Sequence, residues 1–205
     1  MTRELVELHE TSSTRDGKRF ASLAVTVVLL LSSCGALGEE VPSPVLVFTG
    51  GDTPFSYGFE GTQPGEQYLF GDLPLCLDSA GAQVEITSVA LGKSSRGFGV
   101  TDFATRVRQD DPGWESIGNA TGSLKAAGFA DGSSPKVSTV CDSASPTGGV
   151  TELMIELTKE EATTAVGAPL LVTYRWDGGE ASLSIPFTVA LCGRPSGEPV
   201  RICNQ

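Results

Sequence analysis

The strongest constraint on the fold is an alternation of apolar and polar side chains on either side of an Asp-Gly pair. Apolar residues occupy every second position from Leu170 to Trp176 and again from Leu183 to Leu191, and Asp177-Gly178 lies between the two runs. A two-residue hairpin turn needs positive φ, which Asp-Gly adopts readily, and strict alternation is typical of a half-buried strand. The stretch predicts a β-hairpin. Pro186 predicts a sheet edge or a β-bulge in the second strand, because proline has no N–H to donate.

The same period of two recurs upstream, with two changes of parity. Val84 and Ile86 share one face, whereas Val89 falls on the other, and the face changes again between Val100 and Phe103. One extra residue in a strand moves every later side chain to the opposite face. We therefore predict β-bulges in both segments, and a crossing from one sheet to the other in this region.

Three further segments carry local predictions. Residues 153–157 place Leu153, Ile155 and Leu157 on one face, opposite Glu152, Met154, Glu156 and Thr158. Residues 68–77 are predicted to form a strand with a bend or a sheet edge at Pro74. Residues 159–166 are predicted to form one short helical turn. Residues 109–135 show no clear pattern.

These segments add up to about seven to nine short strands with turns between them. The chain also has 25 glycines and 12 prolines, which suit many tight turns. The pattern predicts an all-β fold, an antiparallel two-sheet sandwich of immunoglobulin-like architecture. A closed β-barrel is the alternative.

A basic segment followed by an apolar run lies near the N-terminus. Arg15, Lys18 and Arg19 precede the uncharged stretch 20–31. A helix that crosses a membrane needs about 20 apolar residues, so this run is too short to span and has the length of a signal-peptide core. Leu31, Ser32, Ser33 and Cys34 follow directly.

Leu31-Ser32-Ser33-Cys34 resembles the lipobox of bacterial lipoproteins. The resemblance implies cleavage before Cys34, a diacylglyceryl group on its thiol and a further acyl chain, such as palmitate, on its amine. It predicts a signal peptide over 1–33, a lipidated flexible tether over 34–44 and a single β-sandwich domain over 45–205. The alternatives are a plain signal peptide in which Cys34 is incidental, or an uncleaved short anchor.

The chain has five cysteines, and an odd number in a secreted protein needs an explanation. Lipidation of Cys34 leaves four, namely Cys76, Cys141, Cys192 and Cys203. Four cysteines in an oxidising compartment predict two disulfides, for which three pairings exist. We favour Cys76–Cys141 and Cys192–Cys203, the second joining the C-terminal tail to the last strand. Free buried thiols are the alternative.

Charge excludes some partners. The chain has 14 Lys+Arg against 25 Asp+Glu and a net charge of −11, which argues against nucleic acid as a partner. It also argues against attachment to anionic lipid by a basic patch, so membrane attachment is predicted through the lipid on Cys34.

The one histidine, His9, lies within the predicted signal peptide. A Ser-His-Asp or Cys-His catalytic arrangement and histidine-ligated zinc or copper are therefore not expected after Cys34. We predict no cofactor and no catalytic residue.

Two further candidate sites rest on side-chain type alone. Trp114 lies in a polar segment and is a candidate ligand contact if it is exposed, whereas Trp176 is expected to pack on the hairpin. Asp110, Asp111, Asp131 and Asp142 could bind calcium, but without EF-hand spacing they are better interpreted as solvated turn residues. We predict no metal site.

Four segments together resemble uncharacterised lipoproteins and secreted proteins of high-GC Gram-positive bacteria: 75–78 (LCLD), 86–89 (ITSV), 100–103 (VTDF) and 185–192 (IPFTVALC). The resemblance implies a β-sandwich outside the cytoplasm and no particular activity. We expect a non-enzymatic module, lipid-anchored on the extracytoplasmic face of the cell membrane, that binds or scaffolds an envelope protein or a cell-wall component. The alternatives are an extracellular hydrolase and an ion- or ligand-capturing lipoprotein.

Overall fold

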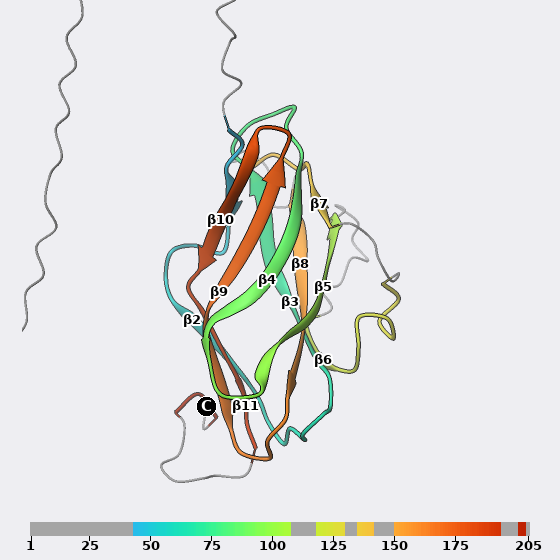
Figure 1. The fold of residues 1–205 in the computed structure, drawn as a ribbon, viewed down its shortest axis with the longest axis vertical. Coiled ribbons are helices and arrows are strands. Elements are labelled where there is room, and N and C mark those ends of the chain that lie inside the picture. Colours follow the sequence, from blue (N-terminus) through green and yellow to red (C-terminus); the bar gives the residue numbers. More distant parts are fainter. Residues whose placement is uncertain (1–42, 108–117, 130–134, 142–149, 194–200, 204–205) are drawn as a thin grey trace, which may run out of the picture. The chain divides into compact units, whose positions relative to one another are not determined.

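The computed structural model describes residues 43–107, 118–129, 135–141, 150–193 and 201–203. Within these residues eleven strands form two sheets (Figure 1). Sheet A contains β1 (Leu46–Phe48), β3 (Tyr68–Leu77), β5 (Phe98–Val107), β6 (Asn119–Thr121) and β8 (Thr151–Lys159). Sheet B contains β2 (Phe55–Phe59), β4 (Val84–Ser94), β7 (Lys136–Val137), β9 (Ala165–Trp176), β10 (Gly179–Ile185) and β11 (Phe187–Leu191). A 3-10 helix, η1, covers Arg201–Cys203.

The predicted two-sheet sandwich is confirmed, with one difference in strand direction. Sheet A has the order β1-β3-β8-β5, with β6 also on β3, and sheet B has the order β2-β11-β9-β4-β7, with β10 also on β9. The strands described here do not close into a barrel. Sheet B is mixed rather than purely antiparallel, because β2 runs parallel to β11.

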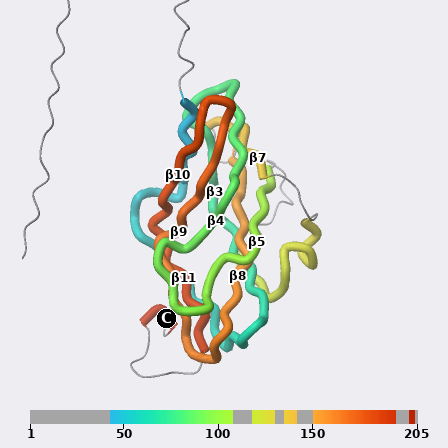
Figure 2. The backbone as a smooth tube through the Cα atoms, viewed as in Figure 1, coloured from blue at the N-terminus to red at the C-terminus, as the bar shows by residue number. Residues whose placement is uncertain are grey.

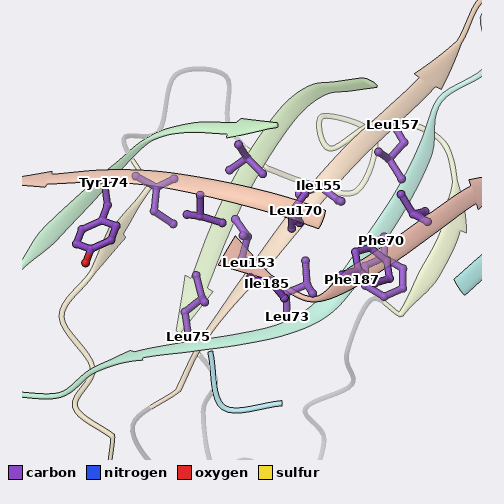
Figure 3. Close-up of a cluster of buried hydrophobic side chains, with 14 of the residues drawn as sticks. Phe70, Leu73, Leu75, Leu153, Ile155, Leu157, Leu170, Tyr174, Ile185 and Phe187 are labelled. Carbon is purple, nitrogen blue, oxygen red and sulfur yellow. The ribbon is translucent and has the colours of Figure 1, made fainter. Parts of the chain in front are cut away.

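The core lies between the sheets and uses the alternation of the sequence. Leu153, Ile155 and Leu157 of β8 point inward and are fully buried. They meet Leu170 of β9 and Phe187 of β11 across the interior (Figure 3). Each fully buried side chain of this size contributes about 1.5–3 kcal/mol of hydrophobic free energy, so the inward faces of these strands hold the two sheets together.

Both predicted bulges are confirmed. The pairing of β4 with β9 shifts between Ile86 and Ser88, and the pairing of β5 with β8 shifts between Val100 and Asp102. The chain passes from sheet B to sheet A between these two strands, as the neighbouring parity changes predicted. Val107 has the same parity as Phe103, which packs against the core, but it is 54% exposed.

A third bulge lies in β3, where the sequence analysis predicted a bend at Pro74. The pairing with β8 shifts between Phe70 and Leu73, and Asp72 has a φ of 61°. The alternative prediction of an edge is wrong, because β3 lies between β1 and β8. Proline fits at position 74 because the register of β1 ends at Leu75 and that of β6 at Phe70; Pro74 O accepts from Thr49 N, and neither register requires an N–H from Pro74.

The predicted hairpin is confirmed, but neither Asp177 nor Gly178 has the positive φ that was expected of the turn. The second strand of the hairpin is interrupted. Gly179 pairs with Trp176 across Asp177-Gly178. The strand predicted to run to Leu191 divides at Pro186 into β10 and β11. Ile185 faces Leu170 and Val189 faces Gly167, so one extra residue lies on the proline side. This is the bulge that the missing N–H predicted.

The predicted helical turn over 159–166 is wrong. Lys159 ends β8, residues 160–162 form a bend, and β9 begins at Ala165. The loop closes instead through Lys159, whose Nζ donates to Thr163 O at 3.0 Å.

The N-terminal and C-terminal ends of the described domain lie at opposite ends of the sandwich. Leu46 pairs with Leu77, the last residue of β3. The helix η1 lies against β2, where Ile202 O closely approaches Gly58. The tube in Figure 2 shows β1 at one end and the C-terminal segment at the other. Among the residues that the structure describes, no helix has the length and the apolar character needed to cross a membrane.

Candidate functional site

The predicted site residues divide into those that the structure describes and those outside it. The lipobox Leu31, Ser32, Ser33 and Cys34 lies outside the described residues, as does Trp114. The aspartates weighed as calcium ligands, at positions 110, 111, 131 and 142, also lie outside them. The four remaining cysteines form two disulfides, Cys76–Cys141 and Cys192–Cys203, which confirms the favoured pairing.

The two disulfides lie at opposite ends of the domain. Cys76 is in β3, and the chain around Cys141 is also held by backbone bonds, because Leu77 N donates to Thr139 O and Cys141 N donates to Leu77 O. The second bridge joins Cys192, just after β11, to Cys203 of η1. The first bridge therefore fixes the end where the chain begins β1, and the second fixes the C-terminal end.

The outer face of sheet A is covered by residues 118–129, which we call the cover segment. A small apolar cluster forms beneath it, comprising Leu69, Ala104, Leu124 and Met154. Two carboxylates of β8 flank Met154 on this face, and both are buried: Glu152 is 2% exposed and Glu156 is 5% exposed. The alternation of β8 placed these residues on one face, but the sequence did not show that this face is covered.

Both carboxylates are engaged by hydrogen bonds. Glu156 accepts from Gln67 Nε2 at 2.8 Å, from Thr101 Oγ1 at 2.9 Å and from the backbone N of Leu124 at 3.0 Å. Buried carboxylates are stable only with such partners. Glu156 therefore joins two strands of sheet A to the cover segment.

Glu152 stabilises the bulge in β3. Its Oε1 accepts from the backbone N of Asp72 at 2.9 Å, and its Oε2 forms an ion pair with Arg106 Nε at 2.5 Å. A side chain at Gly71 would have its Cβ 3.0 Å from Glu152 Oε1, so glycine makes room for the carboxylate.

The geometry of Glu152 and Glu156 does not favour glycoside hydrolysis. Four positions along a strand correspond to about 13 Å, whereas the two carboxyl groups of a glycosidase lie about 5–9.5 Å apart on either side of a sugar. Met154 also lies between them, beneath the cover segment. Among the residues with described positions, no group of three or more His, Cys, Asp or Glu side chains is placed to bind a metal ion.

A hollow of about 360 Å³ opens at the C-terminal end of the sandwich, and we call it the disulfide-end hollow. It is lined by Gly61, Thr62, Gln63, Ala162, Cys192 and Gly193. These residues come from the β2–β3 loop, the β8–β9 loop and the end of β11, which backbone bonds hold together: Thr62 N donates to Cys192 O, and Cys192 N donates to Phe59 O. None of the six lining residues is charged.

A buried lysine lies behind one wall of this hollow. Lys159 is 1% exposed, and its Nζ donates to Thr163 O at 3.0 Å and to Leu191 O at 3.3 Å. A Cβ at Gly193 would lie 2.5 Å from this Nζ and 2.1 Å from Ala162 O. The ammonium therefore lies next to Gly193, one of the residues that line the hollow.

Burial lowers the pKa of Lys159 because the charged form loses its hydration. The sequence held a signal for this residue: Lys159 continues the inward parity of Leu153, Ile155 and Leu157. The burial of Lys159 was not predicted, because residues 159–166 were expected to form a helical turn.

Thr62 adds an unsatisfied polar group to the same place. The residue is 3% exposed, and among the described residues its Oγ1 has no hydrogen-bond partner. The neighbouring Gln63 is satisfied differently, since its backbone N donates to the hydroxyl of Tyr68 at 2.7 Å. Burial, together with a hydrogen bond to Glu66, raises the pKa of Tyr68 and keeps its hydroxyl protonated.

A second hollow, of about 350 Å³, lies at the other end of the sandwich beside the β9–β10 hairpin. Arg175 and Glu85 form an ion pair there at 2.8 Å, and Lys136 and Asp177 also line it. Trp176 packs on the turn, with its ring close to Gly178 and Gly179, as predicted for hairpin packing. Among the described residues, no buried polar side-chain atom without a partner lies at this hollow.

Comparisons with protein-family models, with curated proteins and with solved structures found no match. The functional interpretation therefore rests on the residues and geometry described above.

Proposed function

We propose that the protein is a lipid-anchored module on the extracytoplasmic face of a bacterial cell membrane, where it binds or scaffolds another envelope component. The observation that carries this proposal is the Leu31-Ser32-Ser33-Cys34 motif behind a short apolar run. The cysteines support it, because four of the five form two disulfides and Cys34 is the one left over. Disulfides persist mainly in oxidising compartments outside the cytoplasm.

Binding is favoured over catalysis by the residues available. No histidine occurs after Cys34, which leaves no imidazole for general acid–base chemistry. Among the residues that the structure describes, the two most deeply buried carboxylates, Glu152 and Glu156, hold a bulge and the cover segment. The fold therefore serves as a rigid support for a binding surface.

Chain length limits where that surface can lie. The ten residues between Cys34 and Val45 span at most about 35 Å when fully extended. Val45 leads into β1 at the Cys76–Cys141 end of the sandwich, and its backbone N donates to Asp78 Oδ1. Because the tether joins the domain at this end, the opposite end, with the disulfide-end hollow, is the one that can reach farther from the lipid. We propose this outer end as the surface that meets envelope partners.

Mass spectrometry of the protein from native membranes tests the anchor. We expect the mature chain to begin at Cys34 and to carry a diacylglyceryl group and at least one further acyl chain. Two or more chains hold a protein firmly on a bilayer, whereas one anchors it only marginally. Cys34→Ser should prevent lipidation and release the protein from the membrane fraction. A wild-type chain that begins upstream of Cys34 and carries no lipid contradicts the anchor.

Cross-linking in intact cells tests the binding role. A cross-linkable residue at exposed Gln63, at the outer end, should capture an envelope component that the same residue at exposed Gln83, at the β1 end, does not. Equal capture at both ends contradicts the assignment of the outer end. A ligand-capturing lipoprotein is a second candidate function, and the disulfide-end hollow is the observation that favours it.

A further inference from the structure

We propose that the disulfide-end hollow is a binding site for a small carboxylate. The proposal concerns the folded domain and does not depend on lipidation of Cys34. It rests on three features that meet at this hollow: a space of about 360 Å³, the ammonium of Lys159 behind Gly193, and the unpartnered hydroxyl of Thr62. The volume lies at the small end of the range for ligand pockets.

The first step is electrostatic. Lys159 makes hydrogen bonds only to backbone carbonyls, and among the described residues it forms no ion pair with a carboxylate. A buried charge without a counter-charge is costly. An anion bound in the hollow beside Gly193 would supply a counter-charge close to Nζ.

The acidic neighbours do not cancel this attraction. Glu60, Glu160 and Glu161 flank the loops of the hollow, and all three are exposed. Water and salt screen charges on exposed side chains, whereas a buried charge is screened much less. Glu66 of the β2–β3 loop is exposed as well, so all four carboxylates are screened more strongly than the buried ammonium of Lys159.

The second step is the hydrogen bond. A buried hydroxyl without a partner costs about 1–3 kcal/mol, and such groups in native structures call for an explanation. Thr62 lines the hollow, and a ~120° rotation about its χ1 moves the buried hydroxyl to the position that its methyl group now holds. The rotated hydroxyl would donate to a carboxylate oxygen, and the exposed carboxamide of Gln63 adjoins it.

The charge of the ligand follows from the same features. One buried ammonium matches one negative charge, and the uncharged lining offers no second cation. The net charge of −11 repels a dianion more strongly than a monoanion. A carboxylate is therefore favoured over a phosphate.

Calorimetric titration of the full-length protein in nonionic detergent tests the proposal. The probe is N-acetylglycine, with N-acetylglycinamide as the neutral analogue and inorganic phosphate as the competing anion, all at one ionic strength. We expect N-acetylglycine to bind at least tenfold more tightly than either. Equal binding of the amide would show that the negative charge is not recognised, and tighter binding of phosphate would contradict the assignment to a carboxylate.

Two variants locate the site. Thr62→Val and Lys159→Met should each weaken N-acetylglycine binding about tenfold, the effect of losing one hydrogen bond or charge contact to an ionised group. The matched controls Thr87→Val and Lys93→Met change exposed side chains on β4 and should bind as the wild type does. Wild-type affinity in both site variants would overturn the proposal. Thr62→Val removes an unsatisfied group, so this variant should remain folded. If its unfolding transition is retained, loss of binding cannot be ascribed to misfolding.

Discussion

The strand β8 carries three buried charged residues, and two of them, Glu156 and Lys159, lie on opposite faces in different surroundings. Glu156, on the outer face, accepts hydrogen bonds from three donors on three different segments. Lys159, on the inner face three positions later, donates to two carbonyls, and the hydroxyl of Thr62 beside the same hollow has no partner among the described residues.

The difference separates a structural role from a binding role. A buried polar group whose hydrogen bonds are satisfied specifies one arrangement of the chain around it. Under-satisfied polar groups lower stability, and proteins commonly accept that loss where function needs it. The comparison predicts that substitutions on the Glu156 side reduce stability, whereas substitutions on the Lys159 side change stability little and reduce binding.

The largest effect is expected from Glu156→Leu. The change leaves the buried N–H of Leu124 without an acceptor and releases the cover segment, so the free energy of unfolding should fall by about 3 kcal/mol. Urea unfolding of the full-length protein measures it, with Glu60→Leu as a control at an exposed position, where a change within about 0.5 kcal/mol is expected. Equal losses in both variants would show that Glu156 does not hold the cover segment.

Thr62→Val should act in the opposite direction. The valine fills the same space without a hydroxyl to satisfy, so the free energy of unfolding should rise by about 1 kcal/mol. The control is Thr87→Val, where water can replace the exposed hydroxyl bond to Thr173 O. A loss of stability specific to Thr62→Val would mean that the hydroxyl has a partner in solution, and the contrast with Glu156 would fail.

Lys159→Met should have the smallest effect at neutral pH. Removal of a desolvated charge offsets the loss of two hydrogen bonds to carbonyls, so the expected change is within about 1 kcal/mol. A loss as large as that of Glu156→Leu would contradict the comparison. Lys93→Met, at an exposed position on β4, is the matched control.

The pH dependence of this variant gives a sharper measurement. Burial lowers the pKa of Lys159 below its ordinary value of 10.5, so the unfolded chain binds more protons than the folded chain between the folded pKa and 10.5. Stability from this group therefore rises with pH across that window and is constant below it. Lys159→Met should remove the rise, and Lys93→Met should keep it. Tyr68, whose pKa burial raises above 10.0, has the opposite effect and only above that pH.

Local pattern was sufficient to predict much of this fold. Alternation identified most of the long strands, although not β2 or β6; Asp177-Gly178 identified the position of the hairpin, and parity changes identified the bulges in β4 and β5. These features were predictable because the faces of a strand and the geometry of a turn are set by residues close together in the chain.

The burial of the outer face of sheet A was decided by the tertiary structure. A run of Glu152, Met154 and Glu156 gives no sign of whether water or another segment covers it. The cover segment, residues 118–129, shows no clear alternation of apolar and polar residues. It nevertheless folds over that face, and the backbone N of its Leu124 donates a hydrogen bond to Glu156. The parallel pairing of β2 with β11 is likewise a contact between segments more than 120 residues apart.

The sequence by itself determined the strand faces, the main turn, the cysteine parity and the lipobox-like motif, since each depends on residue type and spacing alone. The tertiary structure decided which side chains lost their water, and so brought Thr62, Lys159 and Gly193 together from three loops and strand ends. Burial depends on what packs above a residue, and chain segments far apart in the sequence supply that packing.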